Sequence, residues 1–295
     1  MTTEPVIAAI DAGGTSFKCA LVGKDGTLIA TWRVPTTTPS ETLDICAASF
    51  REQAQKHKVD PIALGIASFG PVDTDPKSPS FGKITGTAKP GWNSVPIGPH
   101  LSDAIGVPFY LDTDVNAALL AELRWGSAKS LNSAAYMTVG TGIGVGICVN
   151  GGLVGQPTHP EFGHIRVARH LSDQAFAGTC ALHGDCLEGL ASAKSFEARW
   201  GDAAVVPADH QAWEIEAHYL AQACLNLYMM TRLERIILGG GLLQADHLYT
   251  KVAAAFDTLM GDYLPVSGAE LITAPGLGEH VGVLGGAVLA LEAFN

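Results

Sequence analysis

Short apolar runs alternate with polar, glycine-containing turns through the first part of the chain. The runs VIAAID, FKCALVG and LIATWRV have the length of strands, and a Gly-Gly-Thr-Ser turn joins the first two. This order predicts an antiparallel meander. The apolar residues of segment 41–57 then recur at helical spacing, which predicts a helix with Ser40 as its N-cap.

The same alternation returns further along the chain. VPFYLDTD and ERIILGGG predict strands, and AAYMTVGTGIGVGICVNGGLV predicts two strands around a glycine-rich turn. Helical spacing predicts three helices in this part of the chain. One follows the run VPFYLDTD, a second spans residues 214–232, and the third closes the chain at 280–294. Residues 73–99, rich in Pro, Gly, Ser and Thr, are typical of a long functional loop.

Two strand–turn–strand motifs carry Thr and Gly, at residues 11–15 and 138–144. They indicate a duplicated α/β architecture with a cleft between its halves. We therefore expect an N-terminal α/β domain at 1–112, completed by a C-terminal helix at 280–295, and a second α/β domain at 113–279.

Composition narrows the class of protein. The 295 residues are 47% hydrophobic and 16% charged, which is typical of a well-packed globular chain. A net charge of −11 argues against nucleic acid and anionic membrane surfaces as partners. No apolar run is long enough to span a membrane and no secretory signal is evident, so we expect a cytoplasmic protein.

Four metal-type donors gather in one segment. Three follow a Cys-x2-His-x2-Cys pattern with a histidine upstream, and the set is His164, Cys180, His183 and Cys186. Two thiolates and two imidazoles suit tetrahedral Zn²⁺ with no open position, which predicts a structural zinc loop. The flanking carboxylates Glu161 and Glu188 would then belong to an acidic pocket that the ion holds in shape. The alternative is a buried histidine among ordinary cysteines.

Three glycine-containing turns could approach a phosphate group. Their residues are Asp11, Gly13, Gly14 and Thr15, then Thr141 and Gly142, then Gly239, Gly240 and Gly241. Glycine lets main-chain N–H groups contact phosphate oxygens, and Asp11 could hold Mg²⁺. None has a Walker or dinucleotide pattern. The alternative readings are plain hairpins for the first two turns and a helix-entry turn for the third.

Asp114 stands where a predicted strand meets a predicted helix. One interpretation is a helix N-cap. The other is a general base that accepts a hydroxyl proton during phosphoryl transfer.

These motifs occur together, and in this order, in the ROK family (repressor, open reading frame, kinase), which the chain resembles over nearly its whole length. Within the family it is most similar to bacterial fructokinases. The shared segments are Ser68-Phe-Gly-Pro-Val72, Lys89-Pro-Gly-Trp92, Thr113-Asp-Val-Asn116, Glu161-Phe-Gly-His164 and the Cys-His-Cys loop that ends at Glu188.

The resemblance implies a two-domain ribonuclease H-like fold of the actin, Hsp70 and hexokinase type, a zinc loop, and homodimers. ATP with Mg²⁺ would phosphorylate a sugar, and Asp114 would be the catalytic base. The resemblance further implies that five residues bind the sugar: Thr113, Asn116, Glu161, His164 and Glu188. His164 would also bind zinc through its other ring nitrogen.

The residue before the catalytic aspartate bears on the substrate. Many relatives that act on glucose or acylhexosamines carry Asn there, where this chain has Thr113. We therefore expect a fructokinase. Glucose, mannose or N-acylmannosamine as the main substrate is the first alternative. A non-catalytic regulator, a zinc module and an actin-like ATPase are more distant ones; we expect no DNA-binding domain ahead of Asp11.

Overall fold

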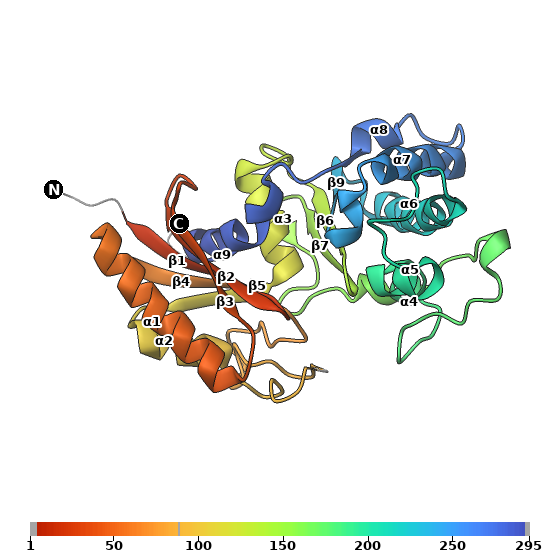
Figure 1. Ribbon diagram of the computed structural model, residues 1–295. Helices are drawn as coiled ribbons and strands as arrows, with labels where there is room; N and C mark the ends of the chain where they lie inside the picture. Colours follow the sequence, from red (N-terminus) through yellow and green to blue (C-terminus); the bar gives the residue numbers. More distant parts are fainter. Residues whose placement is uncertain (1–4, 88, 293–295) are drawn as a thin grey trace. The chain divides into compact units, whose positions relative to one another are not determined.

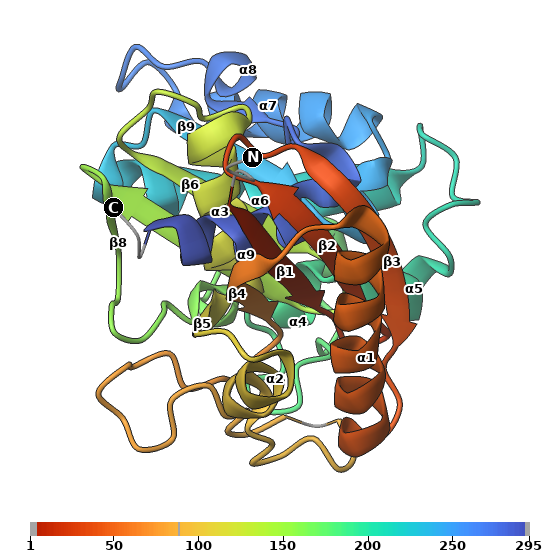
Figure 2. The same cartoon turned by 90° about the vertical axis from the view of Figure 1, so that its left-hand side faces the viewer.

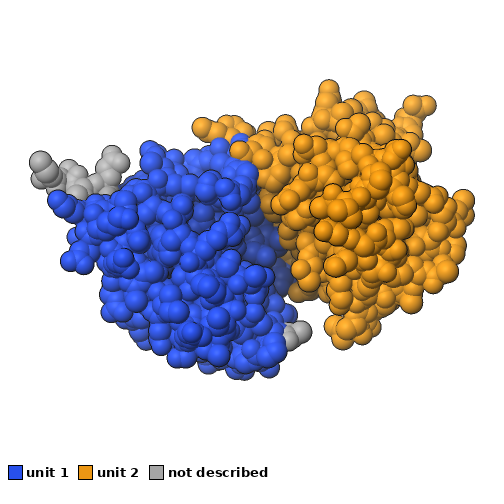
Figure 3. Space-filling view, viewed as in Figure 1, with its two compact units in different colours: residues 1–126, 155–159, 277–295 blue, residues 127–154, 160–276 orange. Residues whose placement is uncertain are grey.

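The computed structural model describes residues 5–87 and 89–292, and the chain divides into two compact units (Figure 3). Unit 1 contains residues 1–126, 155–159 and 277–295, and unit 2 contains residues 127–154 and 160–276. The helix that begins at Asp114 belongs to unit 1, where it packs against the C-terminal helix. The domain boundary expected after residue 112 stays a prediction.

Unit 1 is built on a five-stranded mixed sheet with the order β3-β2-β1-β4-β5 (Figures 1 and 2). The predicted meander is confirmed, because β1, β2 and β3 pair antiparallel, whereas β4 and β5 run parallel to β1. The elements are β1 (Val6–Ala12), β2 (Ser16–Gly23), β3 (Leu28–Pro35), α1 (Pro39–His57), β4 (Pro61–Ser68), α2 (Ile97–Ile105), β5 (Phe109–Thr113), α3 (Asp114–Trp125), the 3₁₀ turn η4 (Gly278–His280) and α9 (Val281–Glu292).

Both faces of this sheet are covered, which explains why β1 is apolar at nearly every position. Ala8 and Ile10 belong to a core completed by α1 and α2, whereas Ile7 and Ala9 belong to a core completed by α9. Figure 2 shows α1 lying along one face. A Cβ atom at Gly65 of β4 would lie only 1.7 Å from the carbonyl oxygen of Gly286 in α9, so glycine is required for this close packing.

Unit 2 repeats the plan with the strand order β10-β9-β6-β7-β8. The elements are β6 (Ala134–Val139), β7 (Ile143–Val149), β8 (Gly152–Leu153), η1 (Phe162–His164), η2 (Leu171–Asp173), α4 (Leu187–Ala191), α5 (Ala193–Trp200), α6 (Gln211–Thr231), β9 (Arg235–Gly239), η3 (Gly241–Gln244), α7 (His247–Met260), α8 (Gly268–Leu271) and β10 (Ile272–Thr273). In Figure 1, α4 to α7 gather on one side of this sheet. Their apolar side chains and those of β6, β7 and β9 form a single core.

The expected duplication is visible in the strand pairing. The first three strands of each sheet form an antiparallel meander, and two further strands follow parallel to the first. Each sheet thus carries a glycine-containing turn between its first two strands, at residues 13–15 in unit 1 and 140–142 in unit 2. The α/β fold with two mixed sheets is the one predicted.

Local boundaries differ from the predictions in three places. Helix α1 begins at Pro39 with Thr38 as N-cap, so Ser40 lies inside the first turn, where its hydroxyl donates to Asp44. Proline is well suited to the first helical position, which moves the start upstream. The expected loop 73–99 ends earlier, because α2 begins at Ile97. The last helix is described as far as Glu292; the rest of the predicted 280–294 lies outside the described residues.

None of the helices in the described part of the chain is long and apolar enough to cross a membrane.

Candidate functional site

The parallel strands of unit 1 bring separate motifs to one edge of its sheet. Ala12 of β1 aligns with Ser68 of β4, and Ser68 aligns with Thr113 of β5. Gly13 and Asp114, which follow β1 and β5, therefore leave the sheet at the same carboxyl edge. In open α/β sheets this is the edge where ligands bind.

Asp114 is the first residue of α3, and Thr113 rather than Asp114 is the N-cap. The Thr113 hydroxyl accepts a hydrogen bond from the main-chain N–H of Asn116, at 3.2 Å. The N-cap interpretation of Asp114 is therefore wrong. One carboxylate oxygen of Asp114 accepts from the N–H of Val115, at 2.9 Å. That contact leaves the rest of the carboxylate available at the sheet edge.

The environment of Asp114 gives it the pKa of a general base. Burial, followed by the negative charge of Asp11, raises the pKa of Asp114 from 3.8 to about 6. Main-chain hydrogen bonds and the charge of His159 oppose the rise. At neutral pH the carboxylate is ionised and still basic enough to take a proton from a hydroxyl group that is losing it.

A buried polar network lies just behind Asp114. The Asp112 carboxylate accepts hydrogen bonds from the Thr113 N–H at 2.6 Å, the Asn116 side-chain amide at 2.9 Å and the Gln156 amide at 3.0 Å. The Oδ1 atom of Asn116 is fully buried and has no hydrogen-bond partner. An unsatisfied buried acceptor is costly, so Asn116 Oδ1 is suited to accept a hydrogen bond from a hydroxyl group of a ligand.

Asp11 lies beside a cation and a helix N-terminus. Its carboxylate is 3.5 Å from the ammonium of Lys18, which stands opposite it in the β1–β2 register. A Cβ atom at Gly282, in the first turn of α9, would lie 2.4 Å from this carboxylate. Burial raises the pKa of Asp11, and Lys18 opposes the rise. The oxygen ligand of Asp11 fits Mg²⁺, provided that Lys18 moves away from it.

The turn between β1 and β2 is open on its outer side. Gly13 donates to Ser16 O at 3.2 Å and the hydroxyl of Thr36 donates to Gly13 O at 2.8 Å, which fixes the shape of the turn. No atom lies within 4 Å of the position that a Cβ at Gly14 would take, and Thr15 is exposed. A phosphate could therefore contact the main chain here.

In unit 2 the four predicted metal donors converge. The donor atoms of His164, Cys180, His183 and Cys186 all lie within 4.8 Å of one another. The Nδ1 atom of His164 is 3.5 Å from Cys186 Sγ and 3.8 Å from Cys180 Sγ, and His183 Nδ1 is 3.8 Å from Cys180 Sγ. Tetrahedral Zn²⁺ with ordinary bond lengths separates N and S ligands by about 3.6 Å, so the donor set fits zinc.

A rigid loop positions these donors. Cys180 and Gly184 exchange main-chain hydrogen bonds, and Gly184 has φ +62°, a left-handed conformation that favours glycine. Arg166 and Arg169 both pair with Asp185 in the same turn. The loop is thus held from outside as well as by the predicted ion.

Glu188 connects the zinc loop to the second glycine-containing turn. It stands two residues after Cys186 in the first turn of α4, and its carboxylate accepts a hydrogen bond from Ile143 N at 3.0 Å. A Cβ atom at Gly142 would lie 2.6 Å from the same carboxylate. Thr141, the neighbouring turn residue, is exposed. Glu188 and the candidate phosphate turn are therefore one local structure.

His164 ends the short helical turn η1, and Glu161 is its N-cap. Glu161 precedes it and accepts from the main-chain N–H of His164, at 3.0 Å. Because His164 directs Nδ1 to the two thiols, its Nε2 atom points to the opposite side of the ring. Nδ1 thus faces the candidate metal donors, and the expected contact of Nε2 with a sugar stays a prediction.

The third glycine turn follows β9 in unit 2. A Cβ atom at Gly240, which has φ +98°, would lie 2.5 Å from Val139 O, and one at Gly239 would lie 2.2 Å from Tyr136 Oη. These two glycines allow β9 to pack closely against β6. Gly241 has open space around it, so of the three it is the one that a ligand can approach.

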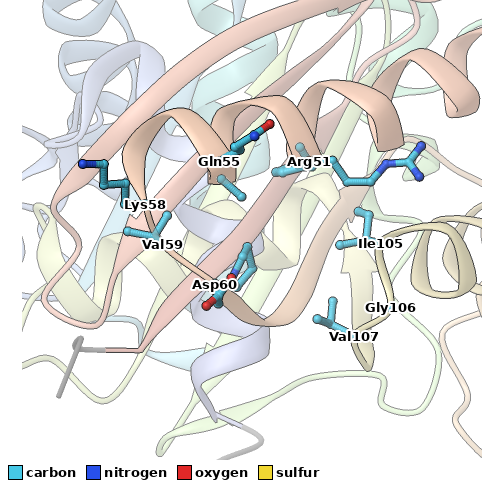
Figure 4. A pocket seen from close by; sticks show the side chains of 11 residues that line it. Arg51, Gln55, Lys58, Val59, Asp60, Ile105, Gly106 and Val107 are labelled. Atoms are coloured by element: carbon cyan, nitrogen blue, oxygen red, sulfur yellow. The ribbon is translucent and has the colours of Figure 1, made fainter. Parts of the chain in front are cut away.

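The largest of the hollows described on unit 1 lies elsewhere. It measures about 680 Å³ and is lined by the end of α1, Asp60 and Pro61 at the start of β4, and the turn after α2 (Figure 4). That position is the amino edge of the parallel strands, opposite the edge that carries Asp114. We do not count it as part of the candidate site.

Two comparisons of the sequence with known proteins identify the relatives of this chain. The ROK family model matches residues 7–293. The chain belongs to the ROK family. The fructokinase of Zymomonas mobilis is 40% identical over 99% of this chain and 98% of its own length, and that of Streptococcus mutans is 37% identical over 92% of both.

The solved structures agree on the fold. A ROK hexokinase from Thermus thermophilus matches with a TM-score of 0.81 and 25% identity, over 98% of this chain and 99% of that one. A ROK family glucokinase from Streptomyces griseus, in complex with glucose and AMPPNP, matches with a TM-score of 0.77 and 23% identity, over 97% and 99%. The predicted hexokinase-type fold is confirmed.

The sequence patterns assign no role to three residues at the unit 1 edge. Asp112 organises Asn116 and Gln156, Lys18 pairs with Asp11, and Lys89 reaches the first glycine turn. The contact of Asp112 with Asn116 could have been predicted from their i, i+4 spacing. The pairing of Lys18 required the strand register, and the contact of Lys89 joins segments far apart in the chain.

Proposed function

We propose that the protein transfers the terminal phosphoryl group of ATP to the 6-hydroxyl group of D-fructose. As a ROK family member with kinases as its full-length relatives, it is an ATP-dependent sugar kinase. The choice of fructose rests on one observation: relatives named fructokinase are 36–40% identical over nearly the whole chain, whereas those named glucokinase are 27–29% identical.

The proposed reaction needs little covalent help from the protein. The sugar oxygen attacks the terminal phosphorus, the bond between that phosphorus and the bridging oxygen breaks, and ADP leaves. The Asp114 carboxylate accepts the proton of the attacking hydroxyl. Its raised pKa supports this role, because a base near pKa 6 is ionised at neutral pH yet accepts the proton readily.

The phosphate contacts come from main-chain donors. In unit 1 the candidate phosphate contacts are Gly13, Gly14 and Thr15. In unit 2, taken by itself, they are Thr141, Gly142 and Gly241. Mg²⁺, which Asp11 would hold, neutralises charge on the phosphate oxygens when it is bound.

Each unit, taken by itself, offers candidate contacts for sugar hydroxyl groups. Asn116 offers its buried, unpaired Oδ1 atom, and Thr113 positions it through the N-cap. Glu161, Glu188 and the Nε2 atom of His164 would bind further hydroxyl groups. Zinc would fix the ring of His164 and, through Cys186, the position of Glu188. The homodimer and the cytoplasmic location stay predictions.

A coupled ADP-release assay with Mg-ATP tests the proposal. The acceptors are fructose, glucose, mannose and N-acetylmannosamine, and a reaction without sugar measures ATP hydrolysis. We expect a specificity constant for fructose well above the others. The Asp114→Asn variant, which keeps the shape of the side chain, serves as the inactive control.

Each outcome has a definite meaning. Preference for glucose, mannose or N-acetylmannosamine would keep the kinase and change its substrate. ADP release that is independent of sugar would indicate an ATPase. No turnover with any sugar, in protein that contains zinc, would contradict the proposal.

A further inference from the structure

The side chain of Lys89 reaches the first glycine turn. Its ammonium donates a hydrogen bond to Gly14 O at 2.5 Å, although the two residues are 75 positions apart in the chain. Both residues belong to unit 1. A cation therefore stands at the rim of the turn that follows β1.

A rigid turn holds Lys89 in this place. Residues 89–92 form a β-turn in which Trp92 N donates to Lys89 O at 3.2 Å. Proline stands second, and Gly91 stands third with φ +78°, which is the pattern of a type II turn. The main-chain N–H of Lys89 also donates to the Thr87 hydroxyl, at 3.2 Å. The backbone of Lys89 is thus constrained on both sides.

Trp92 fixes this turn to the body of unit 1. Its side chain is fully buried between Phe17 and Phe69, with ring centroids at 5.6 and 5.7 Å. Its indole N–H donates to Thr37 O at 3.0 Å. Because Trp92 cannot move without exposing a large apolar surface, the placement of Lys89 is part of the fold.

The charges near the first glycine turn indicate what the Lys89 ammonium could bind. The sheet edge carries the carboxylates of Asp11 and Asp114, which repel a phosphate. The turn brings no cation of its own, because Ser16 follows Thr15, and Lys18 is paired with Asp11. Among the described residues Lys89 has no carboxylate partner, and Gly14 is its hydrogen-bond acceptor. Lys89 is therefore the cation available to balance an incoming phosphate.

We propose that Lys89 is a catalytic residue whose ammonium contacts the phosphoryl group while it is transferred. The bond to Gly14 uses one of three ammonium donors, and two remain for phosphate oxygens. Because the turn shares an edge with Asp114, the phosphate held there is the one that meets the attacking hydroxyl. The inference rests on the proposed phosphoryl transfer, and it adds a residue to that site.

Steady-state kinetics of full-length variants give the first test. Lys89→Met should lower kcat by about 10² or more, as removal of one preorganised donor does, and should leave the KM for the sugar nearly unchanged. Lys89→Arg keeps the charge and should recover part of the loss. Lys77→Met removes an exposed lysine from the same long loop and should behave as the wild type.

Nucleotide binding gives a second test that needs no acceptor. Calorimetry should show that Lys89→Met weakens Mg-AMPPNP about tenfold or more, whereas Mg-ADP, which lacks the terminal phosphate, changes little. Equal losses for both nucleotides would make Lys89 a structural part of the turn and overturn the inference. So would values equal to those of Lys77→Met.

The two proposals can fail separately. If the wild type phosphorylates no sugar but binds AMPPNP more weakly after Lys89→Met, then the proposed function fails and the phosphate contact stands. If sugar is phosphorylated at an unchanged rate by Lys89→Met, then the contact fails and the kinase stands.

Discussion

The surroundings of Asp114 in the fold give its carboxyl group a pKa that an exposed aspartate does not have. It is partly buried at the start of α3, and the charge of Asp11 adds to the effect of burial. Thr113 takes over the capping role that Asp114 could have had. The Asp114 carboxylate therefore does not cap α3, and it lies at the carboxyl edge of the sheet.

The pH dependence of the reaction follows from this pKa. A base must be ionised to accept a proton, and the pKa of Asp114 is raised to about 6. We expect kcat/KM for the sugar to be level near pH 8 and to fall tenfold per pH unit well below pH 6. The measurement is a pH–rate profile at fixed Mg-ATP, with coupling enzymes kept in excess. An acid limb near pH 4 would show that Asp114 is an ordinary, solvated carboxylate.

For single residues, the sequence predicts which residues belong to a site better than it predicts which residues they contact. The four candidate zinc donors follow a local spacing, whereas for Asp114 the sequence pattern left two interpretations and the family resemblance favoured the general base. Lys18 faces Asp11 only because of the β1–β2 register, and Lys89 meets Gly14 only after a long loop has folded over Trp92. Contacts of that kind depend on the packed structure and leave no local pattern.

In the proposed function, the zinc loop holds Glu188 and His164 in place for the sugar. Cys186 is both a candidate metal donor and the N-cap of α4, whose first turn carries Glu188. Serine is a good N-cap, so Cys186→Ser should keep the helix start and remove only the soft ligand. We expect dialysed Cys186→Ser to lose its zinc and its KM for the sugar to rise by an order of magnitude or more.

A second buried cysteine provides the control for that change. Cys224 lies in α6, is as fully buried as Cys186, and is not one of the four donors. Cys224→Ser makes the same chemical change and should retain one zinc per chain, as measured by elemental analysis. Equal zinc contents in the two variants would contradict the metal assignment.

Helices α5 and α6 are joined by a buried charge network. Arg199, 7% exposed, pairs with Asp173 at 2.5 Å and donates to Ser195 O at 3.1 Å. Asp173 also accepts from Tyr219 Oη at 2.7 Å. Burial raises the pKa of Glu216, 3.9 Å from Arg199, well above its usual range, so Asp173 carries the balancing charge.

Removing the cation from this network should be costly. Arg199→Met leaves the Asp173 carboxylate buried without its cation, and such a loss typically costs about 3–5 kcal/mol. Urea unfolding should show this decrease in the free energy of unfolding. Arg232→Met removes an exposed arginine that lies over Tyr228 and should change the value by less than about 1 kcal/mol. Similar values for both variants would mean that the network contributes little.

The sequence predicts best the elements that have several turns of apolar periodicity or that end in a tight turn. The first three strands, α1, α3, α6 and α9 follow apolar periodicity, and their order is as expected. The short helices α4 and α5 were missed, since a helix of two turns or less gives little periodic signal. Helix α1 begins upstream of the predicted start because proline occupies its first position.

On the scale of the whole molecule, the two units share one strand topology but differ in what stabilises them. Unit 1 is stabilised by apolar cores on both faces of its sheet, and none of its described residues belongs to the metal cluster. Unit 2 has its own core and also contains the zinc loop. The sequence reveals the repeat through its two glycine-containing turns, but the exact division of the chain depends on packing such as that of α3 against α9.

This difference predicts how the protein responds to loss of zinc. An ion that binds the folded form and not the unfolded form stabilises only the unit that holds it. Differential scanning calorimetry after chelation should therefore show one transition that moves down by on the order of 10 °C, while a second changes little. The Cys186→Ser variant should show the lowered transition without chelator, and chelator should not lower it further. If both transitions moved together, the units would unfold as one, and zinc would stabilise the whole chain rather than unit 2 alone.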